Sequence, residues 1–143
     1  MRSTHFLNFV NFAALLIAML ALAGCEVEGP AFKRMVRPGT KAIIYVYRPY
    51  HYMGSIDEPE ITCGSDTIGI GAGGYHAFVE DPGTIKCSAA TAPANPVTFE
   101  ARAETDYFVR EVVSEGLASS PVTLTKVDRA TGLDEIESTR TPQ

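Results

Sequence analysis

The sequence predicts an all-β fold, an antiparallel β-sandwich of about seven short strands with a short helix near the C-terminus. Short apolar or β-branched segments recur at intervals of about 8–12 residues and are separated by turn residues. Between them, the apolar residues do not repeat at the helical period of about 3.6. This succession is typical of a sandwich. After removal of a signal sequence over residues 1–24, the remaining chain is long enough for one hydrophobic core and too short for two.

The first strand is predicted over residues 42–47, Ala-Ile-Ile-Tyr-Val-Tyr. A β-branched and aromatic run with almost no polar residue is typical of a central strand that is covered on both faces. Arg48 and Pro49 end this strand, and a loop over residues 50–59 follows.

The other strands are shorter or alternate between apolar and polar residues. Asp81-Pro82-Gly83 is the turn of a predicted hairpin. Thr131 and Asp134 have the spacing of a capping box, which predicts a helix of one or two turns. The β domain is expected over residues 41–137, with a flexible tail over residues 138–143. Its remaining strands are predicted over residues 60–63, 66–70, 75–80, 84–89, 97–102, 107–113 and 121–127.

The N-terminus has the pattern of a secretory signal peptide. Residues 12–23 are apolar throughout, and this run is shorter than the roughly 20 residues of a membrane-spanning helix. Leu22-Ala23-Gly24-Cys25 then resembles a bacterial lipobox, which predicts removal of residues 1–24 and acylation of Cys25. Two alternatives stay open. Ala21-Leu22-Ala23 also fits an ordinary A-x-A cleavage site, which would release a soluble product, and an uncut run would be a signal anchor.

Acylation of Cys25 predicts a lasting membrane anchor, because each buried CH₂ of two or three acyl chains contributes about 0.8 kcal/mol. Glu26 follows the cysteine, whereas Asp at this position is the usual signal for retention in the inner membrane. We therefore expect a cell-envelope protein at the outer membrane, facing the periplasm.

Residues 25–40 are expected to be the lipid-anchored linker. Its basic residues are either solvated or close to anionic head groups; they are Lys33, Arg34 and Arg37.

The chain without its signal peptide is acidic. Of its 12 Lys and Arg residues, Arg2 leaves with the signal peptide, so 11 basic residues face 17 acidic ones and the net charge is −6. A general nucleic-acid-binding protein is basic, and we expect no nucleic-acid partner.

Two further cysteines, Cys63 and Cys87, predict a disulfide, because an even pair in a small exported domain lies in an oxidising compartment. Closing a loop of about 24 residues would stabilise the fold by roughly 3 kcal/mol. Two buried free thiols are the main alternative. A metal site with His76 is disfavoured, since a closed zinc site needs four ligands. We expect no metal.

The sequence favours no enzyme and no cofactor. Residues 69–74 match G-x-G-x-x-G, but a strand follows them instead of the helix that a dinucleotide site requires, so a tight turn with positive φ is expected. Only His51 and His76 remain after signal removal, and no hydrolase or metalloprotease motif is present. We therefore assign no catalytic residue.

The loop after the first strand is the best candidate for a binding site. Aromatic residues and methionine are enriched at interfaces, and this loop is rich in both. Two alternatives stay open: the rings fold back over the core, or they bind a small molecule. The candidate partner-binding residues are Tyr50, His51, Tyr52 and Met53.

Three segments resemble a family of small bacterial lipoproteins of unknown function: the Tyr-x-Tyr-Arg-Pro motif of residues 45–49, the glycine turn before Tyr75, and the aromatic strand that ends in Val109-Arg110. The resemblance covers residues 41–137. It implies a lipid-anchored sandwich similar to carboxypeptidase-regulatory and prealbumin-like domains, and it transfers no catalytic residue. We expect a non-enzymatic module that binds an envelope protein. The alternatives are a carbohydrate- or peptidoglycan-binding module and an inhibitor of an extracytoplasmic hydrolase.

Overall fold

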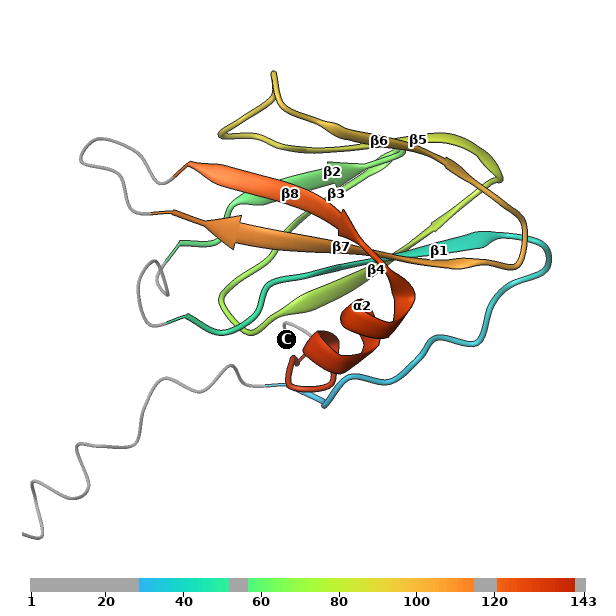
Figure 1. The fold of residues 1–143 in the computed structure, drawn as a ribbon, viewed down its shortest axis with the longest axis horizontal. Helices are drawn as coiled ribbons and strands as arrows, with labels where there is room; N and C mark the ends of the chain where they lie inside the picture. The colour runs from blue at the N-terminus through green and yellow to red at the C-terminus, as the bar shows by residue number, and fades with distance from the viewer. Residues whose placement is uncertain (1–28, 52–56, 115–120, 141–143) are drawn as a thin grey trace, which may run out of the picture.

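The computed structural model describes residues 29–51, 57–114 and 121–140. Within them, it contains two four-stranded sheets and one short helix (Figure 1). The first sheet has the strand order β4-β1-β7-β8, and the second has the order β3-β2-β5-β6. The elements are β1 (Ala42–Tyr47), β2 (Glu60–Cys63), β3 (Asp66–Gly69), β4 (Tyr75–Glu80), β5 (Gly83–Ala89), β6 (Val97–Ala101), β7 (Asp106–Val113), β8 (Val122–Val127) and α2 (Arg129–Ile136).

The sandwich-like all-β fold is confirmed, with eight strands in place of about seven. The two sheets share one apolar core, to which Ile44, Val46 and Phe78 contribute from the first sheet and Ile61 and Ile85 from the second. Burial of this apolar surface is the main favourable contribution to the stability of the domain.

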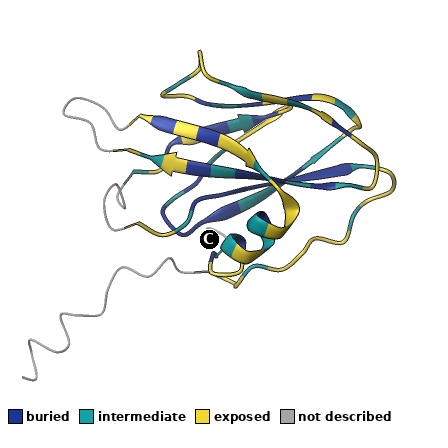
Figure 2. Ribbon diagram, in the orientation of Figure 1, coloured by how far each residue is buried: buried dark blue, intermediate teal, exposed yellow. Residues whose placement is uncertain are grey.

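A second apolar cluster covers the outer face of the first sheet, the face that is turned away from the second sheet. Tyr45, Tyr47 and Phe108 of this face pack with Ile136 of α2 and with Phe32. As a result, all six residues of β1 are buried, as expected for a central strand that is covered on both faces (Figure 2).

The expectation of a wholly antiparallel sandwich is wrong for one strand pair. β1 pairs with β4 in an antiparallel arrangement but with β7 in a parallel one, with Ile43 opposite Asp106. Strands that follow each other directly can be joined by a hairpin, which makes them antiparallel. Between β1 and β7 the chain passes through the second sheet, so no hairpin fixes their relative direction.

The helix begins earlier than the capping-box spacing predicts. Its N-cap is Asp128, whose carboxylate accepts hydrogen bonds from the backbone N–H groups of Ala130 and Thr131 at 2.9 and 3.1 Å. Thr131 therefore lies inside the first turn and donates its hydroxyl to Asp128. A carboxylate at the N-cap satisfies N–H groups that have no partner within the helix.

Residues 31–37, which we call the strap, run along the outer face of the first sheet before β1 begins (Figure 1). The ring of Phe32 contacts the rings of Tyr45 and Tyr75 edge to face, at centroid distances of 5.4 and 5.1 Å. The backbone N–H of Met35 donates to the hydroxyl of Tyr45 at 2.9 Å. This part of the expected linker therefore packs against the domain.

In the part of the chain that the structure describes, no helix is long and apolar enough to cross a membrane. The predicted signal peptide and Cys25 lie outside the described residues.

Candidate functional site

An open cleft of about 330 Å³ lies where the end of β1 meets β7 and the C-terminal end of α2. Side chains from two strands and the helix converge there because β1 and β7 are neighbours in the first sheet and α2 packs on the outer face of that sheet. Its lining residues are Pro49, His51, Arg110, Glu111, Val112, Glu135 and Ser138.

Glu135 is the centre of the polar network in this cleft. One carboxylate oxygen accepts a hydrogen bond from the hydroxyl of Tyr47, and the other accepts one from Nη1 of Arg110 at 2.8 Å. Burial raises the pKa of Tyr47 far above its ordinary value, and the hydrogen bond to Glu135 raises it further, so the phenol stays protonated and donates. The two donors hold the carboxylate in a fixed orientation. Arg110 is only about a third exposed.

Arg48 fixes the backbone around the cleft. Its guanidinium is almost fully buried, and Nη1 donates to the carbonyl oxygens of Asp57 at 2.6 Å and Ile70 at 3.4 Å. Its backbone N–H donates to the carbonyl oxygen of Gly74, and its own carbonyl accepts from Gly73, both at 2.9 Å. One residue therefore ties the end of β1 to both neighbouring loops, and we call this set of bonds the Arg48 clamp.

Glu111 lies between the sheets next to this clamp. It shares a face of β7 with Tyr107 and Val109, which pack in the core between the sheets, since alternate residues of a strand point to the same face. Its side chain is fully buried, and its carboxylate lies 3.9 Å from Nη1 of Arg48. Among the described residues, neither carboxylate oxygen has a hydrogen-bond partner. Burial raises the pKa of Glu111 to about 8, and the charge of Arg48 only partly opposes this shift.

The structure describes two of the four predicted binding residues. Tyr50 is 51% exposed, so it does not fold back over the core. His51 is exposed and lines the cleft. Tyr52 and Met53 lie outside the described residues.

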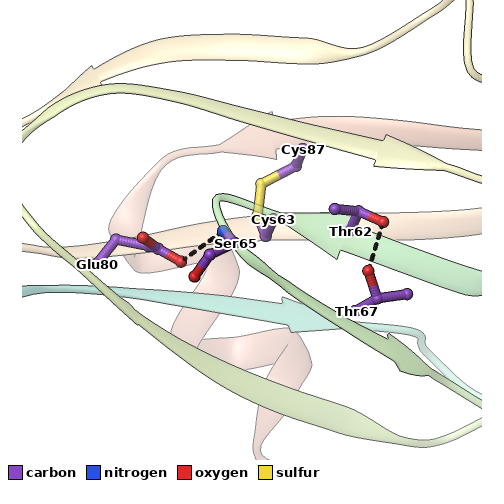
Figure 3. Close-up of a disulfide and its surroundings, with 6 residues drawn as sticks. All are labelled: Thr62, Cys63, Ser65, Thr67, Glu80 and Cys87. Carbon is purple, nitrogen blue, oxygen red and sulfur yellow. Dashed lines mark hydrogen bonds between the residues drawn. A yellow bond between two sulfur atoms is a disulfide. The ribbon is translucent and has the colours of Figure 1, made fainter.

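The two cysteines of the domain lie directly opposite each other in adjacent strands. Cys63 of β2 pairs with Cys87 of β5, their Cα atoms are 4.2 Å apart, and the structure joins their sulfur atoms in a disulfide (Figure 3). Both side chains are fully buried. Beside them, the hydroxyls of Thr62 and Thr67 lie 2.8 Å apart across β2 and β3 (Figure 3).

His76, the third partner considered for a metal site, packs edge to face on the ring of Phe78, at a centroid distance of 4.8 Å. Burial lowers the pKa of His76, which keeps the imidazole neutral at physiological pH. No group of three or more potential metal-ligating side chains occurs within the described residues.

The glycine-rich segment before β4 is a tight turn, as predicted. Gly73 adopts a φ of 77°, which favours glycine, and the N–H of Gly74 donates to the carbonyl oxygen of Gly71 at 2.9 Å. The strand β4 follows directly, at the place where a dinucleotide motif has its helix.

Comparison of the chain with protein-family models, with curated proteins and with solved structures found no match. The resemblance to the lipoprotein family stays a prediction.

Sequence reasoning missed five lining residues of the cleft: Arg110, Glu111, Val112, Glu135 and Ser138. They are far from the predicted loop in the sequence. The parallel pairing of β7 with β1, which puts Arg110 opposite Tyr47, and the packing of α2 against β7 bring them beside it. For the buried pair of Arg48 and Glu111, the sequence did contain a signal. Glu111 follows Tyr107 and Val109 at the period of two, and a carboxylate on the apolar face of a strand predicts a buried charge.

Proposed function

We propose that this protein is a lipid-anchored envelope lipoprotein whose domain binds another protein and does not catalyse a reaction. The surface that we assign to the partner consists of Tyr50 and the adjoining cleft. One observation carries the proposal: Tyr50 is 51% exposed at the end of β1, beside a cleft whose charged groups have fixed orientations.

The chemistry of this surface suits a protein partner. Tyrosine and arginine are the residue types that dominate binding energy at protein interfaces, and Tyr50 and Arg110 are both available at this end of the sheet. The Arg48 clamp holds the backbone on either side of the loop. A surface that is already ordered loses less conformational entropy when a partner binds.

The orientation of Glu135 supports recognition. Its carboxylate accepts hydrogen bonds from Tyr47 and Arg110, so its charge is positioned and partly neutralised before any partner arrives. Electrostatic groups of this kind contribute mainly to the specificity and the rate of association.

The test is site-specific photocrosslinking in intact envelopes. A benzophenone amino acid replaces Tyr50, and a matched probe replaces Lys86, which is exposed on β5 of the second sheet. We expect one protein to crosslink at position 50 and not at position 86. The triple variant Tyr50→Ala, His51→Ala, Tyr52→Ala should abolish its stoichiometric recovery, whereas Lys86→Ala combined with Thr98→Ala should not. Equal crosslinking at the two positions would contradict the proposal.

A carbohydrate- or peptidoglycan-binding module is the second candidate, and the polar lining of the cleft favours it. Glu135, Ser138 and His51 offer hydrogen-bonding groups next to an exposed tyrosine ring. Sedimentation with isolated peptidoglycan decides between the two candidates. If peptidoglycan retains the protein, and the triple variant is not retained, glycan binding replaces protein binding. If the crosslinked partner is a hydrolase and loses activity in the complex, this protein acts as an inhibitor of that hydrolase.

A further inference from the structure

We propose that the strap is a membrane-contact surface, on which the side chains of Met35 and Val36 enter the interface of an anionic bilayer and the neighbouring cations contact its head groups. The inference rests on the proposed lipid anchor at Cys25 and goes beyond it, because it assigns an orientation to the domain.

The first observation is the exposure of two adjacent apolar side chains. Val36 is 90% exposed and Met35 is 43% exposed. Their backbone is held in place, since Phe32 packs into the outer cluster and the N–H of Met35 donates to Tyr45. Two apolar side chains are thus presented to the surroundings from an ordered segment.

The second observation is a surplus of positive charge around these side chains. The guanidinium groups of Arg34, Arg37 and Arg129 all form ion pairs with the buried carboxylate of Asp106. Three cations share one anion, which leaves an excess of two positive charges. Arg34 and Arg129 keep about half of their side chains exposed, and Lys33 beside them is exposed as well.

The position of the strap in the chain favours a bilayer as its occupant. Ala31 is six residues after Cys25, and an extended chain spans at most about 3.6 Å per residue, so the strap begins within roughly 20 Å of the anchored cysteine. Apolar side chains flanked by basic ones are the pattern of segments that lie in a membrane interface, where anionic lipids attract the cations.

The test uses the fact that the chain contains no tryptophan. The variant Val36→Trp carries one reporter on the strap, and Lys86→Trp carries one on the second sheet as the matched control. Each protein is extracted from membranes and reconstituted into phosphatidylglycerol-containing vesicles with or without lipids brominated in the acyl chain. We expect quenching of the Val36→Trp fluorescence to exceed that of the control roughly twofold or more, and to decrease when phosphatidylglycerol is replaced by phosphatidylcholine.

Equal quenching at the two positions would overturn the inference, as would quenching at position 36 that does not depend on anionic lipid. The intact mass of the same preparations reports on Cys25 separately. A mass without acyl chains contradicts the proposed anchor, whereas the ratio of quenching between the two reporters decides whether the strap contacts the bilayer.

Discussion

The carboxylate of Glu111 lies 3.9 Å from Nη1 of Arg48 in the interior of the sandwich, and neither of its oxygens has a hydrogen-bond partner among the described residues. A buried ion pair with unsatisfied oxygens recovers only part of the desolvation free energy of its two charges. This pair therefore makes the stability of the domain sensitive to the protonation of one side chain.

The substitution Glu111→Gln is expected to change how stability depends on pH. The pKa of Glu111 is raised from 4.5 to about 8, so between these values the native state binds a proton that the unfolded chain does not. The stabilising contribution of the neutral acid is present below about pH 4.5 and is lost as the pH rises to about 8. Glutamine resembles the neutral acid, and Glu111→Gln should raise the free energy of unfolding at pH 8.5 by about 1–3 kcal/mol.

Urea unfolding at pH 5, 6.5 and 8.5 measures this effect. Burial lowers the pKa of His76, so its contribution to stability has the opposite trend and is lost as the pH falls below 6.5. For this reason the difference in unfolding free energy between variant and parent is compared. Glu100→Gln, at an exposed site on β6, is the control. The same pH slope in the parent and in Glu111→Gln would show that this carboxyl is not the source.

Removal of the Arg48 clamp should destabilise the domain more than loss of a surface arginine. Arg48→Met leaves the carbonyl groups of Asp57 and Ile70 without this donor. With a pKa of about 8, Glu111 is mainly the neutral acid at neutral pH, so the lost hydrogen bonds dominate the effect. We expect a loss of about 1–3 kcal/mol at neutral pH, measured by denaturant unfolding. Arg102→Met, at an exposed position after β6, should change stability by less than about 0.5 kcal/mol. Equal losses of unfolding free energy in the two variants would show that the Arg48 clamp stabilises the domain no more than a surface arginine does.

The disulfide between Cys63 and Cys87 should be detectable by its contribution to stability. Reduction under native conditions, or the double variant Cys63→Ala, Cys87→Ala, is expected to lower the free energy of unfolding by roughly 3 kcal/mol. Thiol titration of the unfolded, unreduced protein checks the bond directly, because these two residues should yield no free thiol. Two titratable thiols would instead support the alternative of buried free cysteines.

Gly132→Ala should lower the stability of the domain, whereas alanine in place of glycine usually stabilises a helix. Alanine normally stabilises a helix interior by about 1 kcal/mol relative to glycine. Here a Cβ atom on Gly132 would lie 2.3 Å from the ring of Phe108, because α2 packs closely against β7. We expect a loss of about 1–3 kcal/mol in thermal or urea unfolding. Phe108→Ala removes the ring and leaves only Cβ, so Gly132→Ala should cost less in the Phe108→Ala background than in the parent if this contact is its cause.

The strands were predictable because their signals are local. The apolar, β-branched and aromatic character of residues 42–47 and 107–113 is a property of consecutive residues, and it predicted strand limits within one residue of β1 and β7. The parallel pairing of these two strands was not predictable in this way, since it depends on the route of the chain through the second sheet.

The candidate site was predictable only on one side. The loop with Tyr50 and His51 could be identified from its aromatic content, but Arg110 reaches the cleft through the pairing of β7 with β1, and Glu135 reaches it through the packing of α2 against β7. The contacts of the strap were not predictable for the same reason, because they join residues that are far apart in the sequence. Its basic residues suggested a solvated segment or head-group contact, whereas Asp106, which binds Arg34 and Arg37, is about 70 residues away in the sequence and only the fold brings it near.

The parallel pairing of β1 with β7 also limits when the pairing of β1 can be completed. β1 comes first in the chain, yet one of its edges stays unpaired until β7 has been made, after six of the eight strands. A six-residue apolar strand with an open edge is a template for pairing between chains. Contacts between residues so distant in the sequence also form slowly. The newly made chain therefore passes through a period in which its most apolar strand needs protection from aggregation.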